Sequence, residues 1–228
     1  MKFTSATMTK ASGSAGGVTA SRNKGGMYLR GRANPINRNT APQQAIRSYV
    51  AALATAWQST LTAAQRAAWA TYAANVTKVD SLGASINVSG NNWFLGNNVP
   101  RLQGGYAVVD PGPTTFNTSS LTPPVGSYSI AAGHLSIAFT NTDQWATAVG
   151  GALLVYISQQ QNPTINFFKG PFLFLGSVAG ALVAPTSPKT LVVTPVPTLG
   201  NLLYVRYVAT TADGRLTASY IQQVVVAA

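Results

Sequence analysis

Side chains that commonly perform catalysis are scarce in this chain. The sequence contains no cysteine and no glutamate, and it has one histidine (His134) and four acidic residues (Asp80, Asp110, Asp143 and Asp213). Enzymes take most of their nucleophiles, general acids and bases, and metal ligands from these residue types. The composition therefore favours a non-enzymatic protein that uses no cofactor, no metal ion and no small-molecule substrate.

Disulfide partners and long apolar runs are also missing. The longest apolar stretch, residues 172–184, lies between Pro171 and Pro185 and is interrupted by Gly176 and Gly180. It is shorter than the roughly 20 apolar residues that are needed to cross a bilayer. Residues 1–17 contain no apolar segment like that of a secretory signal peptide. We therefore expect a soluble protein, made in the cytoplasm, with no membrane partner.

Negative charge is absent from residues 1–79. Ten of the 15 basic residues lie there: Lys2, Lys10, Arg22, Lys24, Arg30, Arg32, Arg38, Arg47, Arg66 and Lys78. Residues 1–39 are also rich in Gly, Ser and Thr, without sustained periodicity, which is typical of a segment that has no core of its own. We interpret residues 1–39 as an extended basic arm that is attracted to an acidic protein surface or to nucleic acid. Strand-like pieces such as residues 27–29 are expected to pair with a neighbouring chain on binding.

Residues 40–113 have the pattern of a small helical domain. Two amphipathic stretches within residues 40–76, separated by a break at residues 59–60, predict a helical hairpin. The first begins after Thr40 and the second after Thr62, which forms a capping-box pattern with Gln65. A weaker helix is expected over about residues 89–103, ended or bent by Pro100. The predicted helical core consists of the apolar residues at helical spacing: Ile46, Val50, Leu53, Trp57, Trp69 and Tyr72.

Residues 114–228 change to the alternating pattern that is typical of β-strands. Seven short candidate strands occupy residues 128–131, 135–140, 152–158, 172–178, 190–193, 203–210 and 216–226. Residues 212–214 indicate a hairpin between the last two strands, and the turn-rich residues 110–113 mark the boundary with the helical domain. The predicted fold is α+β: an extended basic arm, a helical hairpin, and a C-terminal antiparallel β-sandwich of the immunoglobulin or fibronectin type.

Several motifs occur in order over residues 17–113. A Gly-rich basic start (residues 17–30) precedes the pattern Pro-x-Asn-x-x-Thr-x-x-Gln at residues 35–43. The pattern Leu-Thr-x-x-Gln-Arg-x-Ala-Trp follows at residues 61–69, and residues 98–105 complete the set. With these motifs the chain resembles a family of uncharacterised proteins encoded by tailed bacteriophages and prophages. The resemblance implies a structural role in the virion and carries over no catalytic residue.

The resemblance and the charge distribution together predict how the chain assembles. We expect the arm and the helical hairpin to dock on neighbouring subunits, which are other virion proteins and copies of the chain itself. The chain would then be a capsid-decorating (cement) protein or a component of the neck or tail. The predicted docking residues are the arm's basic and aromatic side chains: Arg22, Lys24, Tyr28, Arg30, Arg32 and Arg38.

Three other functions remain open from the sequence. The arm could bind nucleic acid through Arg30 and Arg32, although only one aromatic residue lies among its charges and no nucleic-acid-binding fold is recognisable. The β-domain could bind a glycan or a host surface through exposed Trp145 or Tyr156. An enzyme would need a pocket that joins His134 to an aspartate, and we consider this the weakest alternative.

Overall fold

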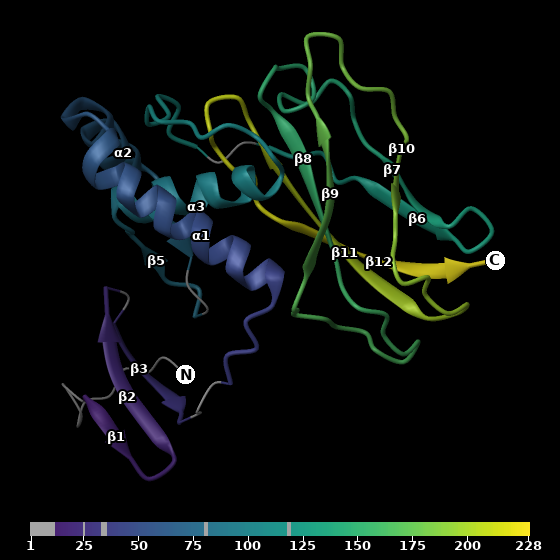
Figure 1. Cartoon of the computed structure of the whole chain (residues 1–228), viewed down its shortest axis with the longest axis horizontal. Coiled ribbons are helices and arrows are strands. Elements are labelled where there is room, and N and C mark those ends of the chain that lie inside the picture. The colour runs from purple at the N-terminus through teal and green to yellow at the C-terminus, as the bar shows by residue number, and fades with distance from the viewer. Residues whose placement is uncertain (1–11, 25, 33–35, 80–81, 118–119) are drawn as a thin grey trace.

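The computed structural model describes residues 12–24, 26–32, 36–79, 82–117 and 120–228, which form three parts (Figure 1). A small N-terminal sheet lies below a layer of helices, and the helices pack beside a large C-terminal sheet. The α+β class is therefore as predicted, and residues 1–11 of the predicted arm lie outside the described residues.

The N-terminal sheet is built from the predicted arm. Strands β1 (Gly13–Ala15), β2 (Val18–Asn23) and β3 (Gly26–Gly31) form an antiparallel meander. Gly16, with a φ of 56°, makes the tight turn between β1 and β2. The strand-like piece at residues 27–29 lies in β3 and pairs with β2 of the same chain. The arm is thus a folded sheet in this region and not an extended segment, because short turns bring its strands together within the chain.

The helical layer contains three helices in the described part of the chain. Helix α1 (Ala41–Thr55) runs into a π-helical turn, η1 (Ala56–Thr60), and is followed by α2 (Ala63–Asn75) and α3 (Gly90–Gln103). Strands β4 (Lys78–Val79) and β5 (Ser85–Ile86) form a short hairpin between α2 and α3. Both α1 and α2 pack against α3, which differs from the predicted two-helix hairpin. Helix α3 also continues through Pro100 to Gln103 and does not end at the proline.

The C-terminal strands lie close to the predicted segments. They are β6 (Val125–Ser129), β7 (His134–Ala138), β8 (Ala152–Ile157), β9 (Leu173–Ala179), β10 (Lys189–Val192), β11 (Leu202–Thr210) and β12 (Tyr220–Ala227). The predicted hairpin between the last two strands is present as the antiparallel pair of β11 and β12.

The predicted β-sandwich is wrong. All seven strands belong to one sheet in the order β10-β7-β6-β12-β11-β8-β9, and β12 pairs with β6 in parallel. The edge strands β9 and β10 approach each other, so the sheet curls into a nearly closed barrel. Alternating hydrophobicity marks inward and outward positions equally well in a sandwich and in a barrel, and therefore does not specify strand order.

Two apolar clusters meet at strand β8, which is buried on both faces. Leu153 and Val155 point into the barrel core, whereas Leu154 and Tyr156 form an outer cluster with Tyr106 of the segment that follows α3. This outer cluster fixes the helical layer to the barrel wall.

Candidate assembly surface

The arm joins the body at a polar clasp on the first turns of α1. Arg47 donates from Nη2 to Asn37 Oδ1 (2.9 Å) and from Nη1 to Asn39 Oδ1 (3.4 Å). Gln44 Nε2 donates to the carbonyl oxygen of Asn39 (3.2 Å), whose φ of 49° lies in the left-handed region that asparagine tolerates. These contacts are exposed, so each adds little to stability. The clasp therefore joins residues 37–39 to the first turns of α1.

The same segment contains the start of α1. The backbone N–H of Thr40 donates to Gln43 Oε1 (3.4 Å), which forms part of a capping box, and Pro42 lies in the first turn. The motif Pro-x-Asn-x-x-Thr-x-x-Gln thus has a local structural explanation. Its Asn37 accepts a hydrogen bond from Arg47 of α1, and its Thr40 and Gln43 form the capping box that begins α1.

The two faces of the arm sheet differ in chemistry. In the register of β2 and β3, Ala20 lies opposite Leu29 and Arg22 opposite Met27, so Ala20, Arg22, Met27 and Leu29 share one face. The other face carries Thr19, Ser21, Tyr28 and Arg30. Met27 and Leu29 are half-buried, and within the described residues no helix or further sheet forms a second layer over this three-stranded sheet. One face of the arm sheet therefore combines apolar side chains with the exposed cation of Arg22, and the other combines hydroxyl side chains with Tyr28 and Arg30.

The predicted docking residues lie on the arm sheet and on the segment of the chain between β3 and α1. Arg22, Lys24, Arg30, Arg32 and Arg38 are exposed, and Tyr28 is half-buried. Among the described residues the one ion pair joins Asp213 to Arg215 in the barrel, so none of the arm's cations is neutralised within this part of the chain.

A groove lies next to the clasp, between α1 and the start of β9. Its volume is about 730 Å³, and its walls include Ile46 and Tyr49 of α1, Gln103 of α3, and Leu173 and Phe174 of β9. The side chain of Leu173 is half-exposed at its edge. The groove and the clasp share Arg47, and the groove also includes Gln43 of the adjoining capping box, so they form one continuous surface.

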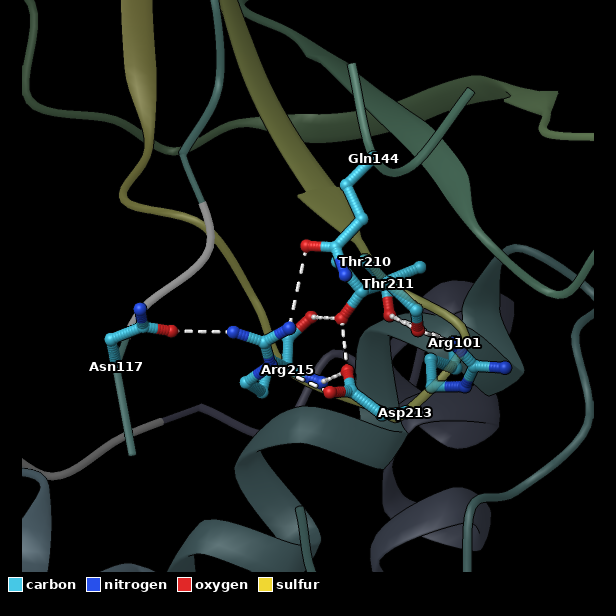
Figure 2. Close-up of polar contacts among 7 residues, drawn as sticks. All are labelled: Arg101, Asn117, Gln144, Thr210, Thr211, Asp213 and Arg215. Carbon is cyan, nitrogen blue, oxygen red and sulfur yellow. Dashed lines mark hydrogen bonds and ion pairs between the residues drawn. The ribbon is translucent and has the colours of Figure 1, made fainter. Parts of the chain in front are cut away.

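A polar network lies where α3 meets the barrel (Figure 2). Arg101 is buried, and its Nη1 donates to Gly150 O (3.0 Å), Thr210 Oγ1 (2.8 Å) and Thr211 O (2.9 Å). Its Nε donates to Ala107 O (3.0 Å). Burial lowers the pKa of the Arg101 guanidinium, and the Asp213 carboxylate partly opposes this shift.

Arg215 forms the second half of this network. Its buried guanidinium donates from Nε to Asp213 Oδ2 (2.7 Å), from Nη2 to Gln144 Oε1 (3.3 Å), and from Nη1 to Asn117 Oδ1. Thr211 Oγ1 donates to the other carboxylate oxygen of Asp213. The network therefore joins segments that are distant in the sequence: Asn117, Gln144 and residues 211–215.

The structure buries only part of the predicted helical core. Leu53, Trp69 and Tyr72 are buried, and Trp57 packs at the margin of their cluster. The rings of Trp69 and Tyr72 meet edge-on at 5.9 Å, and Trp69 Nε1 donates to Asp110 O (2.8 Å). Ile46 instead lines the groove, and Val50 is 40% exposed. The turn-rich segment at residues 110–113 is therefore packed on α2, and Gly112 and Pro113 within it are buried.

The residues proposed for other functions are separated or covered. His134 Nδ1 lies 2.8 Å from the carbonyl oxygen of Ala132, and no described aspartate contacts its ring. Asp143 Oδ1 accepts from the Thr122 hydroxyl (2.8 Å). Trp145 and Tyr156, expected to be exposed for glycan binding, are 1% and 5% exposed.

Arg101 and Arg215 are the important residues that sequence reasoning missed. Their partners are distant in sequence, and a single arginine in a helix or a turn carries no pattern that would reveal them.

Within the described residues, no group of three or more His, Cys, Asp or Glu side chains is placed to hold a metal ion. Across the same residues, no helix has the length and apolarity that a membrane span requires. No protein-family model and no curated protein matches the sequence.

Proposed function

We propose that this chain is a non-enzymatic structural protein of a tailed-bacteriophage virion that assembles on neighbouring subunits through its basic arm and helical layer. The observation that carries the proposal is the arm sheet: none of its described residues belongs to a buried apolar cluster, and its cations lack acidic partners among the described residues. The adjoining groove extends this surface onto α1 and β9. The resemblance over residues 17–113 supports a place in the virion, as capsid decoration or as part of the neck or tail.

Nucleic-acid binding is the second candidate, because the same exposed cations would attract phosphates. The glycan-binding alternative loses its support, since the two aromatic side chains that it requires are buried.

Co-sedimentation with DNA-free capsids and tails tests the proposal. We compare the full-length protein with an arm variant (Arg30→Gln with Arg32→Gln) and with a body variant (Lys169→Gln with Lys189→Gln) that loses the same charge from exposed positions. The wild type and the body variant should bind the particles. The arm variant should bind about two- to thirtyfold more weakly, because each of the two exposed ion pairs contributes about 0.2–1 kcal/mol.

If none of the three proteins sediments with particles while the wild type shifts DNA in a salt-sensitive way, the virion proposal fails and nucleic-acid binding replaces it.

A further inference from the structure

We propose that the outer face of strands β10, β7, β6 and β12 is a self-association surface, on which a second copy of this chain packs face to face about a twofold axis. This contact is separate from the arm and the groove, and the inference does not depend on the proposed function. It gives one of the predicted partners, a copy of the chain itself, a defined place on the barrel.

The alternation of side chains along these strands defines the face. Residues of the barrel core alternate in β6, β7 and β12 with residues that point outward. Taken as every second residue, the outward positions begin at Val125 in β6, His134 in β7, Thr190 in β10 and Ile221 in β12. The strand registers agree, since outward positions lie opposite outward positions in each neighbouring pair. In Figure 1 this side of the barrel lies away from the helical layer.

The composition of the face is that of an interface centre. None of its outward positions is Lys, Arg, Asp or Glu, although about a quarter of the residues of an average soluble protein are charged. Val125, Val192 and Val225 are 62%, 70% and 58% exposed, and Ile221 is 43% exposed. The other positions are small or uncharged polar side chains and His134. Depletion of charge around exposed apolar side chains is typical of the buried centre of protein interfaces.

Two cations border the face but do not lie on it. Lys189, at the first position of β10, is in register with the inward-facing positions of β7. Arg206 belongs to β11, the strand beside β12, and its guanidinium stacks on the rings of Tyr156 (4.5 Å) and Phe172 (5.3 Å). Both rings belong to the β8 and β9 side of the sheet, so the face itself stays uncharged.

The charge distribution selects a second copy as the occupant. Ten of the 15 basic residues precede residue 80, and the arm and helical layer that contain them lie on the other side of the barrel (Figure 1). An acidic protein or a nucleic acid is attracted to that side, and this face offers it no opposite charge. Two copies that each carry a net charge of +11 repel where their basic parts approach. Packing the uncharged faces together keeps the two arms far apart and forms a closed twofold pair.

The size of the face predicts a weak dimer. Four strands about 4.8 Å apart and about five residues long, at about 3.3 Å per residue, form a face of about 300 Å² in projection. Two such faces bury less than the roughly 1,600 Å² of a standard interface. We therefore expect association at high protein concentration, such as that among copies gathered in one assembly.

Sedimentation velocity of the full-length protein from about 10 µM to about 500 µM tests the association. The wild type is compared with a face variant, Val225→Lys, and with a matched control, Val149→Lys. Val149 is 66% exposed and precedes Gly150, which accepts a hydrogen bond from Arg101 where α3 meets the barrel. The wild type and the control should associate as concentration rises. The face variant should associate at least about tenfold more weakly, because each copy loses a buried valine and brings a like charge into the contact.

Two further measurements separate a lost contact from a lost fold. Val225→Glu mixed with Val225→Lys should associate although neither variant does so alone, because opposite charges then meet. The chain contains no cysteine, so single cysteines report directly on proximity. A short bis-maleimide should cross-link Ser127→Cys, in the middle of the face, because packed sheets lie about 10 Å apart. It should not cross-link Ser59→Cys, which is exposed on the helical layer.

Salt distinguishes this contact from one made by the arm. Added salt should strengthen association through the uncharged faces, because it screens the repulsion between two positive copies. A monomer at every concentration, equal effects of the two lysine substitutions, or equal cross-linking of the two cysteine variants overturns the inference. Association that salt weakens and that Arg30→Gln with Arg32→Gln removes would assign the contact to the arm. None of these outcomes depends on the particle assay, which alone decides the proposed function.

Discussion

Replacing Arg101 by methionine should weaken the attachment of the helical layer to the barrel. The side chain is buried and donates to four acceptors, three of them on the barrel: Gly150 O, Thr210 Oγ1 and Thr211 O. The fourth, Ala107 O, belongs to the segment that follows α3. Methionine retains much of the apolar stem but removes every donor, so the substitution isolates the polar contribution.

The expected loss follows from these contacts. A buried acceptor that loses its partner costs about 1 kcal/mol or more, and four acceptors would give about 4 kcal/mol. Part of this loss in stability is regained, because burial disfavours the charged guanidinium and the substitution removes that charge. We therefore expect the free energy of unfolding to fall by about 3 kcal/mol, which corresponds to a decrease in Tm of about 6–12 °C for a chain of this length.

Urea unfolding monitored by tryptophan fluorescence measures this loss. The matched control is Arg206→Met, because Arg206 stacks on the rings of Tyr156 (4.5 Å) and Phe172 (5.3 Å), while its buried Nε has no hydrogen-bond partner. The control should lose no more than about 1 kcal/mol. A loss below about 1 kcal/mol for Arg101→Met, or equal losses for the two variants, would refute the account of Arg101 as the link between α3 and the barrel.

Three further predictions concern other parts of the molecule. Burial raises the pKa of Tyr72, Tyr156 and Tyr207 above 10.0. The unfolded chain therefore binds fewer protons than the folded one above pH 10, and stability should fall as the pH rises further; phenolate absorbance that shows all nine tyrosines ionising together in the folded protein would contradict this. Gly112→Ala should destabilise by about 1–3 kcal/mol in the same urea assay, because a β-carbon there would lie within 2.9 Å of backbone atoms of α2, whereas an unchanged midpoint would show that the contact relaxes freely. Leu173→Asp should leave stability within about 0.5 kcal/mol, since the side chain is half-exposed, yet weaken co-sedimentation with particles; full binding would remove the groove from the proposed interface.

Local features of the fold could be predicted from the sequence because their causes are local. The capping box at Thr62 and Gln65 is present, with Thr62 N donating to Gln65 Oε1 (2.8 Å) and Gln65 N to Thr62 Oγ1 (3.2 Å). The C-terminal strands follow the alternation of apolar residues, and the turn at residues 212–214 contains Gly214 with a φ of 84°. In each case the residues that determine the structure are neighbours in the chain.

Features that depend on distant residues could not be predicted in this way. The barrel needs β12 beside β6, a pairing between segments about a hundred residues apart that no local pattern encodes. Tyr156 is buried because the segment carrying Tyr106 covers the outer face of β8, which alternation alone marks as exposed. Val50 has helical spacing but is 40% exposed, because helical spacing does not specify which helix provides the partner surface.

The candidate surface was partly accessible to sequence reasoning. Charge alone located the basic residues of the arm, and the structure adds the sheet that divides them between two faces. The clasp of Arg47 on Asn37 and Asn39 lay within a recognisable motif, yet its geometry required the turn of the chain at Asn39. The groove joins α1 to β9 and depends entirely on tertiary packing.

Quantitative mass spectrometry of purified virions tests the central claim most directly. The particles are those produced from the genome that encodes this chain, purified by density banding and washed at moderate salt. A virion structural protein should be present in a constant molar ratio to the other structural proteins across independent preparations. If the protein is made during infection but is absent from the banded particles, the structural role is wrong.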